Sequence, residues 1–448
     1  MPPQLKMHES NAFERLVSED QLSPERSWWA RTFSSLQKDS LRGGIFTMLL
    51  TALGTGMFTL HHLYNDIGVA WTVLVLALFA LNYVYAMKLQ ITAAIETRDQ
   101  CRSLNDLVRH FLGSKFLVLF NVVFFIYNMI ALISLILAIT KTFYINFQPW
   151  VWGWIGYFVE VRKERQTLAV FNMYAVWLVG FLLFFLNVQR SVDALRYFSL
   201  ASFFIFVGIV LVCVVQCPSY YHKNSPENSF NIWDFDVVGF FSRFGLAVYS
   251  FNCVTNFYGV YNSVANPSQK RLNKIFRRTF AILFLLFVAY GLSSYFSLGR
   301  KLADDTDLFI FREPLSADDR DLFMRVFRAL LVGSLFIGYA LNVFPLKTMT
   351  FDVLGIDAGP RNNFLVSLFY TLVPVLIAGF FTKITQYANL GGCFSATFIA
   401  FIIPGLLALK LDFFAARWQK VLHILWLAGM VGLAGVGTFM AIKNFESK

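Results

Sequence analysis

Apolar residues along this chain are grouped in long runs that short polar segments separate. Eleven runs reach about 20 residues, the length that an α-helix needs to cross the hydrocarbon core of a bilayer. They lie at residues 44–67, 69–95, 115–142, 167–188, 194–217, 238–262, 276–299, 323–346, 363–382, 389–410 and 419–442. This pattern predicts an all-α, polytopic membrane protein with about eleven transmembrane helices.

The first apolar run contains an interruption near its middle. Gly54, Thr55 and Gly56 stand at mid-depth, where a continuous helix would otherwise be expected. Because hydrocarbon cannot pair the N–H and C=O groups that a break frees, the break must face protein or a water-filled cavity. Transporters place such breaks at substrate sites, since the half-helix that resumes carries a partial positive charge at its N-terminus.

A polar cluster interrupts the sixth run at a comparable depth. Its members are Ser250, Asn252, Cys253, Thr255 and Asn256. Interruptions at matching positions in two sets of five spans predict a five-plus-five inverted repeat, with the binding site between the halves. The predicted segments are a cytoplasmic tail with an interfacial stretch (1–42), a transporter domain (43–442) made of repeat one (43–217), repeat two (238–410) and an extra helix (419–442), and a C-terminal tail (443–448).

Charge agrees with a multi-pass protein embedded in lipid. The formal net charge is +11, and polytopic proteins are commonly basic because their cytoplasmic loops retain Lys and Arg. We therefore expect a lipid bilayer and no nucleic acid as a partner. If the N-terminus is cytoplasmic, the cytoplasmic segments hold 22 Lys and Arg residues and the opposite segments hold 11. Cytoplasmic loops are the more basic ones, so we expect a cytoplasmic N-terminus. The sequence does not specify which membrane holds the protein. Lys88 and Arg243 lie close enough to span ends to reach the headgroups.

Three segments resemble the amino acid/auxin permease family, which contains vacuolar, proton-coupled and sodium-coupled neutral amino acid transporters. GTGMFTLHHLYNDIG resembles the first-helix signature of the family, AVYSFNCVTNFYGVYNSVANPSQKRLNKIFRRTF resembles its sixth helix and basic loop, and NVFPLKTMTFDVLG resembles the end of its eighth helix. His61 departs from the pattern, because the family usually has proline there. The resemblance implies the fold of the bacterial leucine transporter and movement of amino acids by alternating access.

The two interruptions and the resemblance together predict a substrate site. The α-carboxylate is expected at the backbone N–H groups of Thr55, Gly56 and Met57, since a helix N-terminus binds anions and glycine lets a ligand approach closely. The rest of the predicted site, including carbonyls that would meet the amino group, is Leu53, Gly54, Ser250, Phe251, Asn252, Thr255 and Asn256. Neither interruption carries a charged side chain, which favours a neutral substrate. Close helix packing is an alternative role for the two glycines.

The eighth span bears on which ion is coupled to transport. Sodium-coupled members of this fold use hydroxyls on that helix, and the corresponding positions here are Phe336 and Gly338, with Ser334 the nearby hydroxyl. This favours proton coupling or facilitated transport over sodium symport. His61 and Asp66 are the candidate proton-coupling residues, since histidine titrates near neutral pH and ionisable groups in membranes are commonly functional. A packed histidine and a helix cap are the simpler alternatives.

Other classes of protein fit the residues less well. The six histidines are scattered and form no HExxH motif, so we expect no enzyme activity, no metal site and no cofactor. A non-transporting relative, acting as an amino acid sensor or as a structural subunit of a membrane complex, stays open because a fold does not guarantee a function.

Overall fold

The computed structural model describes residues 41–446, apart from 98–99, 102, 156–163, 189–195, 225–229, 265–266, 299–321, 381–383 and 415. A helix occupies each of the eleven predicted runs. The elements are α3 (Leu41–Ala52), α4 (Thr55–Thr59), α5 (His61–Ile67), α6 (Val69–Glu96), α7 (Leu104–Leu112), α8 (Ser114–Ile155), α9 (Glu164–Asn187), α10 (Arg196–Asn224), α11 (Val237–Phe251), η3 (Val254–Asn256), α12 (Phe257–Ser263), α13 (Gln269–Leu298), α15 (Leu322–Leu354), α16 (Pro360–Phe380), α17 (Ile384–Gly391), η5 (Gly392–Ala396), η6 (Phe398–Ile402), α18 (Ile403–Lys410) and α19 (Arg417–Glu446). Nearly all of the predicted N-terminal tail lies outside the described residues.

Length and composition qualify ten of these segments as membrane spans. Among the described residues, nine helical segments are long and apolar enough to cross a bilayer, and the bent pair Leu41–Ala52 and Thr55–Ile67 makes a tenth. The remaining predicted span corresponds to α9, whose described apolar part, Val176–Asn187, is shorter. The count of eleven therefore stays a prediction, whereas the multi-pass helical architecture is confirmed.

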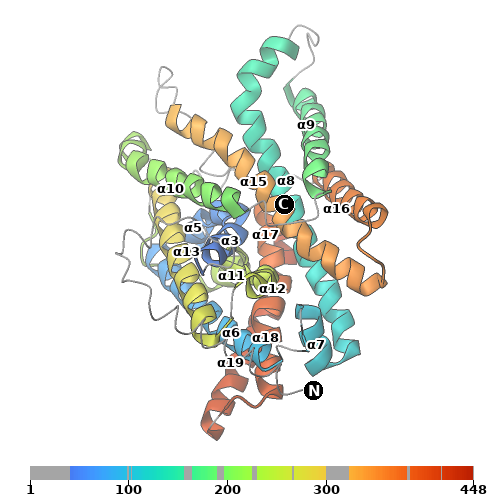
Figure 1. Ribbon diagram of the computed structural model, residues 1–448. Coiled ribbons are helices and arrows are strands. Elements are labelled where there is room, and N and C mark those ends of the chain that lie inside the picture. Colours follow the sequence, from blue (N-terminus) through green and yellow to red (C-terminus); the bar gives the residue numbers. More distant parts are fainter. Residues whose placement is uncertain are drawn as a thin grey trace, which may run out of the picture. The chain divides into compact units, whose positions relative to one another are not determined.

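The helices pack in two groups (Figure 1). In the first group α8, α9, α15 and α16 each contact the other three. The second group consists of the first span (α3, α4 and α5), the sixth span (α11 and α12) and the two helices packed against them, α6 and α13. The fifth span, α10, contacts α3, α13 and α15, and so it connects the two groups.

A buried lysine fastens three helices of the first group. Lys347 on α15 is 5% exposed, and its Nζ donates to the Asn187 carbonyl at 2.6 Å and to Ser367 Oγ at 3.0 Å. Asn187 is the last residue of α9, and Ser367 lies on α16. A cation at a helix C-terminus complements the partial negative charge there, so this lysine joins α9, α15 and α16 at one point.

Glycines allow the sixth and tenth spans to approach very closely. A Cβ at Gly392 would meet the backbone of Gly245, and a Cβ at Gly245 would meet the Asn389 carbonyl. The tenth span is π-helical over η5 and η6, a local widening that is frequent at functional sites. This close contact holds the middle of α11 against the tenth span.

Candidate functional site

The first span breaks at the predicted position. Helix α3 ends at Ala52, α4 begins at Thr55, and the two halves are bent by 47°. Gly54 is the N-cap of the second half with φ −139° and ψ −146°, and no side chain caps it. The first N–H groups of a helix have no partner within the helix. The start of the second half is therefore a cluster of backbone donors.

The sixth span is interrupted by five residues of extended and 3₁₀ backbone, 252–256. Helix α11 ends at Phe251, Asn252 is extended with φ −75° and ψ 103°, and η3 leads into α12. The Asn252 side-chain oxygen accepts a hydrogen bond from the Val254 N–H at 3.3 Å. Asparagine competes with helical hydrogen bonding in this way, which explains why the helix stops here.

The two interruptions lie against each other. Thr51 Oγ1 accepts from Asn256 Nδ2 at 3.1 Å, and the Thr55 hydroxyl lies 3.4 Å from the Tyr249 hydroxyl. Before the break α3 contacts α12, and after it α4 and α5 contact α11. Each half of the first span thus pairs with the opposite half of the sixth, so the two spans run in antiparallel directions.

A cavity of about 30 Å³ lies between the interruptions. The first span contributes Leu50, Thr51, Ala52, Leu53, Gly54, Thr55 and Gly56 to its lining. The sixth span contributes Tyr249 and Asn252, and α8 and α15 supply the remaining walls. All of these side chains are uncharged. A cavity of this size has room for about one or two water molecules, so an amino acid fits only if the walls move apart.

The predicted substrate residues divide among three positions. Leu53, Gly54, Thr55, Gly56 and Asn252 line the cavity. Met57, Ser250 and Phe251 are fully buried outside its lining. Thr255 and Asn256 line a second cavity of about 150 Å³, together with Asn105 and Asp352 among others. Asn256 lines the second cavity and bonds to Thr51, which lines the first, so this hydrogen bond lies between the two cavities.

The sequence did not reveal the walls that come from α8 and α15. Tyr127, Ala131 and Leu135 on α8 face the breaks, as do Ser334 and Gly338 on α15, and the α15 wall also includes Leu335 and Asn342. A weak signal was present on α15, because residues 334, 338 and 342 are small or polar and lie four residues apart, which places them on one helix face.

The side-chain amide nitrogen of Asn252 in the cavity wall lacks, among the described residues, a hydrogen-bond acceptor of ordinary geometry. Asn252 is 2% exposed, and its Nδ2 makes no hydrogen bond of ordinary geometry within the described residues, although the Tyr127 hydroxyl lies near the same amide. A buried donor without a partner costs about 1–3 kcal/mol. A bound ligand that accepts this hydrogen bond would recover that cost.

The two candidate proton-coupling residues lie away from the cavity. His61 is 1% exposed, its Nδ1 lies 2.9 Å from the Phe58 carbonyl, and its Nε2 has no partner in the described part of the chain. Because a carbonyl only accepts, Nδ1 carries the proton. Asp66 accepts a hydrogen bond from Arg243 Nε at 2.9 Å, and the two side chains are 25% and 21% exposed. This ion pair joins α5 to α11.

Solved structures of a bacterial transporter share this architecture. A mutant form of the manganese transporter of Eremococcus coleocola superposes with a TM-score of 0.57 at 12% identity, over 95% of this chain and 89% of that one. The same transporter in complex with an aromatic bis-isothiourea substituted compound gives 0.52 at 13% identity, over the same shares. With its paired broken helices, the chain has the five-plus-five fold of the leucine-transporter class. Within the described residues no three His, Cys, Asp or Glu side chains gather to hold a metal.

Sequence comparison then identifies the family. The model of the transmembrane amino acid transporter proteins matches residues 37–443, and the chain belongs to this family, the amino acid/auxin permeases. The protein named "Putative amino acid transporter AAT1" of Plasmodium falciparum is 22% identical over 61% of this chain, and the match covers only 42% of that protein. Its namesake in Plasmodium berghei is 18% identical over 88% of this chain and 69% of that protein.

Proposed function

We propose that this protein carries a neutral amino acid across a membrane by alternating access, with the substrate bound between the two helix breaks. The observation that carries the proposal is the uncharged cavity between the two breaks, which is lined by an uncapped helix start and by Asn252, whose Nδ2 has no hydrogen bond of ordinary geometry among the described residues. Family membership and the names of the Plasmodium relatives support an amino acid as the substrate.

The cavity chemistry suits the two ends of an amino acid. The N–H groups at the start of α4 and the Asn252 Nδ2 are donors for the α-carboxylate. Carbonyls near Leu53 and Gly54, with the Thr55 hydroxyl, are acceptors for the ammonium group. A charged substrate side chain would need a counter-charge in this low-dielectric site, and the lining residues offer none.

Transport requires the small cavity to widen. The walls on α8 and α15 belong to one group of helices and the breaks belong to the other, so a relative movement of the two groups opens or closes the site. On the side of the 150 Å³ cavity, the Thr51–Asn256 hydrogen bond must break. At the other end, the Asp66–Arg243 pair holds α5 against α11.

Proton coupling is the second part of the proposal. The free Nε2 of His61 is a buried acceptor for a proton. On α15, Phe336 is not part of the cavity lining and Gly338 has no side chain, so neither of the two aligned positions supplies a hydroxyl for sodium. These features support a proton over sodium, with facilitated transport as the alternative.

Flux measurements in proteoliposomes test the proposal. We expect uptake of neutral amino acids that does not change when a large organic cation replaces sodium and that falls when an inward proton gradient is collapsed. Asn252→Ala should weaken substrate binding about 5- to 10-fold, whereas Asn128→Ala is the matched control, because Asn128 is equally buried on α8 but bonds within its own helix at 2.8 Å. Binding without flux would indicate a sensor, and neither binding nor flux would indicate a structural subunit.

A further inference from the structure

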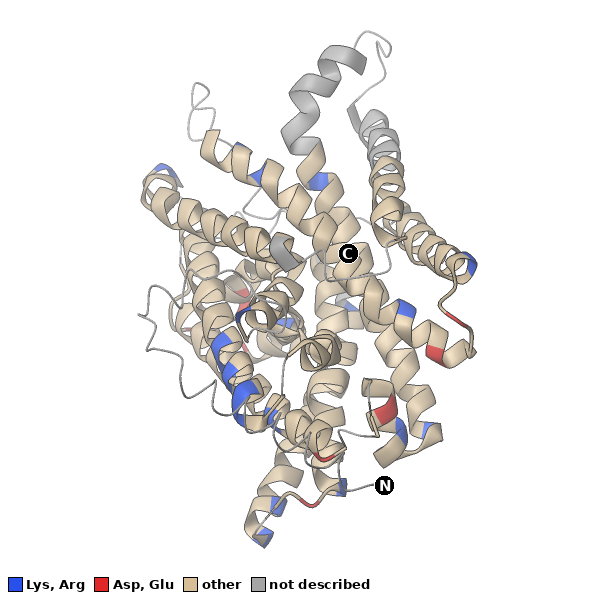
Figure 2. Ribbon diagram, in the orientation of Figure 1, with Lys and Arg blue, Asp and Glu red and all other residues tan. Residues whose placement is uncertain are grey.

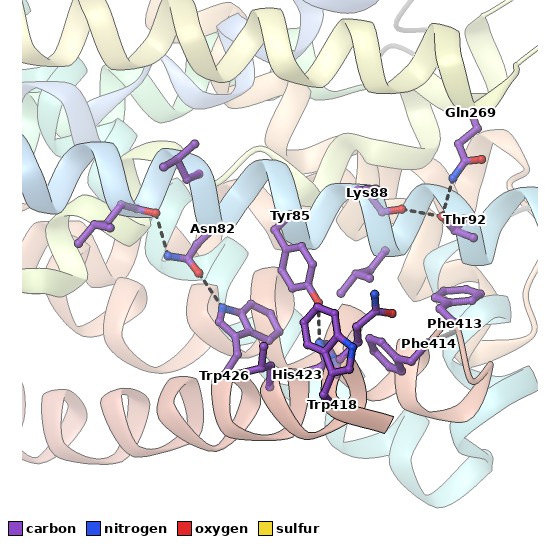
Figure 3. A pocket seen from close by; sticks show the side chains of 15 residues that line it. Asn82, Tyr85, Lys88, Thr92, Gln269, Phe413, Phe414, Trp418, His423 and Trp426 are labelled. Carbon is purple, nitrogen blue, oxygen red and sulfur yellow. Dashed lines mark hydrogen bonds between the residues drawn. The ribbon is translucent and has the colours of Figure 1, made fainter. Parts of the chain in front are cut away.

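A groove of about 780 Å³ lies outside the transport pathway, between α6 and the start of α19 (Figure 3). This volume falls in the range of about 300–1,000 Å³ that is usual for ligand sites. The linker between α18 and α19 closes one end with Phe413 and Phe414, and Gln269 at the start of α13 adds a polar edge. None of its lining residues belongs to the central cavity.

Hydrogen bonds hold the aromatic wall of the groove in place. Tyr85 on α6 bonds to His423 Nδ1 at 2.9 Å, and the other ring nitrogen of His423 bonds to the Gly405 carbonyl at 3.0 Å. The carbonyl can only accept, so Nε2 carries the proton and Nδ1 accepts from the tyrosine hydroxyl. Trp426 donates to Asn82 Oδ1 at 2.6 Å. Figure 3 shows these rings fixed along the interface of α6 and α19, so the groove is preformed.

The groove is apolar at one end and polar at the other. Leu78 and Leu81 lie ten and seven residues before Lys88 on α6, which separates them from it by about 15 and 10 Å along a helix. Beyond Lys88, Thr92 Oγ1 bonds to the Lys88 carbonyl at 2.9 Å and accepts from Gln269 Nε2 at 3.0 Å. Such a gradient fits an amphiphile whose chain lies along the leucines and whose headgroup lies at Lys88.

The polar end is positively charged. The Lys88 side chain is exposed and forms no ion pair with any residue that the structure describes. In contrast, Lys420, which follows the lining residue Gln419, is paired with Asp412 at 2.8 Å. Figure 2 shows basic segments on α13 and on the lower part of α19. An ammonium group without a counter-ion in a preformed groove favours an anionic headgroup.

The mouth of the groove opens toward the lipid. Leu78, Leu81 and Leu422 line it and are 50%, 66% and 56% exposed, and Trp418 at the polar end is 63% exposed. Exposed leucines on two membrane-spanning helices contact acyl chains, while tryptophan is typical of the headgroup level. The occupant therefore comes from the bilayer rather than from the aqueous phase.

We propose that this groove binds an anionic phospholipid, with the headgroup at Lys88 and one acyl chain along the aromatic and leucine wall between α6 and α19. The lipid stabilises the contact between α19, the last predicted span, and α6, the second. This assignment does not depend on the direction, substrate or ion coupling of transport.

Native mass spectrometry on the full-length protein tests the assignment. The chain is reconstituted into vesicles of phosphatidylcholine with or without phosphatidylglycerol, extracted, and examined for retained lipid. We expect one phosphatidylglycerol to be retained in preference to phosphatidylcholine. Lys88→Gln should weaken this retention about fivefold, the equivalent of about 1 kcal/mol for one basic residue at an anionic surface. Lys115→Gln, at an exposed lysine outside the groove, should leave it unchanged.

A second pair of variants tests the groove itself. Leu422→Trp narrows the groove along the acyl chain and should weaken retention of either lipid, whereas Val421→Trp, at a neighbouring residue that is 54% exposed and outside the lining, should not. Unchanged retention in Lys88→Gln or in Leu422→Trp would overturn the proposal. A dimer mass that only Leu422→Trp removes would also overturn it, because the groove would then hold a second copy of the chain.

Discussion

Gly54 and Gly56 are two residues apart, yet the structure predicts opposite consequences for adding one methyl group to each. At Gly56 a Cβ would lie 2.8 Å from Ser250 Cα, 2.9 Å from Ser250 Oγ and 3.1 Å from Tyr249 Cδ1. Backbone cannot move aside as a side-chain tip can, so α4 must separate from α11. At Gly54 the nearest atom is Leu135 Cδ2 at 4.0 Å, an ordinary contact.

The expected magnitudes follow from these distances. Overpacking a tight interface costs about 1–3 kcal/mol, so Gly56→Ala should lower the thermal unfolding temperature of the purified protein. Gly54→Ala places its methyl group at the edge of a cavity of about 30 Å³, and we expect little change in stability. The same methyl group should obstruct the substrate, so the stabilisation that a neutral amino acid gives to the native protein should be lost in Gly54→Ala.

Thermal unfolding with and without substrate measures both effects in one assay. The wild-type protein supplies the reference for stability and for the shift that substrate causes. If Gly56→Ala unfolds at the wild-type temperature, the close approach of α4 and α11 is wrong. If Gly54→Ala keeps the full substrate-induced shift, the space beside Gly54 is not the binding site. Loss of stability in Gly56→Ala therefore supports the packing role of that glycine, which the sequence left as an alternative.

Three further predictions concern charged and titratable groups. Removing either partner of the Asp66–Arg243 pair should accelerate amide hydrogen exchange at the ends of α5 and α11 that the pair joins. A double-mutant cycle in thermal unfolding should give a coupling energy of about 1 kcal/mol between the two residues. Additive effects of the two substitutions would contradict a gating contact. Lys347→Met should destabilise the protein by about 2–3 kcal/mol, because two hydrogen bonds to a charged group are lost, and an unchanged unfolding temperature would refute this. His61→Asn should retain substrate counterflow but lose proton-driven accumulation, while continued accumulation would exclude His61 as the proton carrier.

The hydrophobic pattern determined the architecture because a bilayer imposes strong constraints on it. Only segments of about 20 apolar residues can span hydrocarbon with their backbone groups paired, so each of the eleven runs became a helix. The two breaks were equally visible, since Gly54 and the polar cluster from Ser250 to Asn256 interrupt otherwise apolar spans. The family resemblance, carried by three short segments, is confirmed by the match over residues 37–443.

The tertiary structure alone decided which residues share a cavity. Tyr127 and Asn342 belong to helices whose sequences read as ordinary apolar spans, and only their packing against the first break makes them walls of the site. Asp66 and Arg243 lie 177 residues apart, so no local pattern pairs them. Gly54 and Gly56 look alike in the sequence, but one borders open space and the other borders the backbone of Ser250. Local sequence sets where a helix forms or stops, whereas the contacts between helices depend on how distant surfaces fit together.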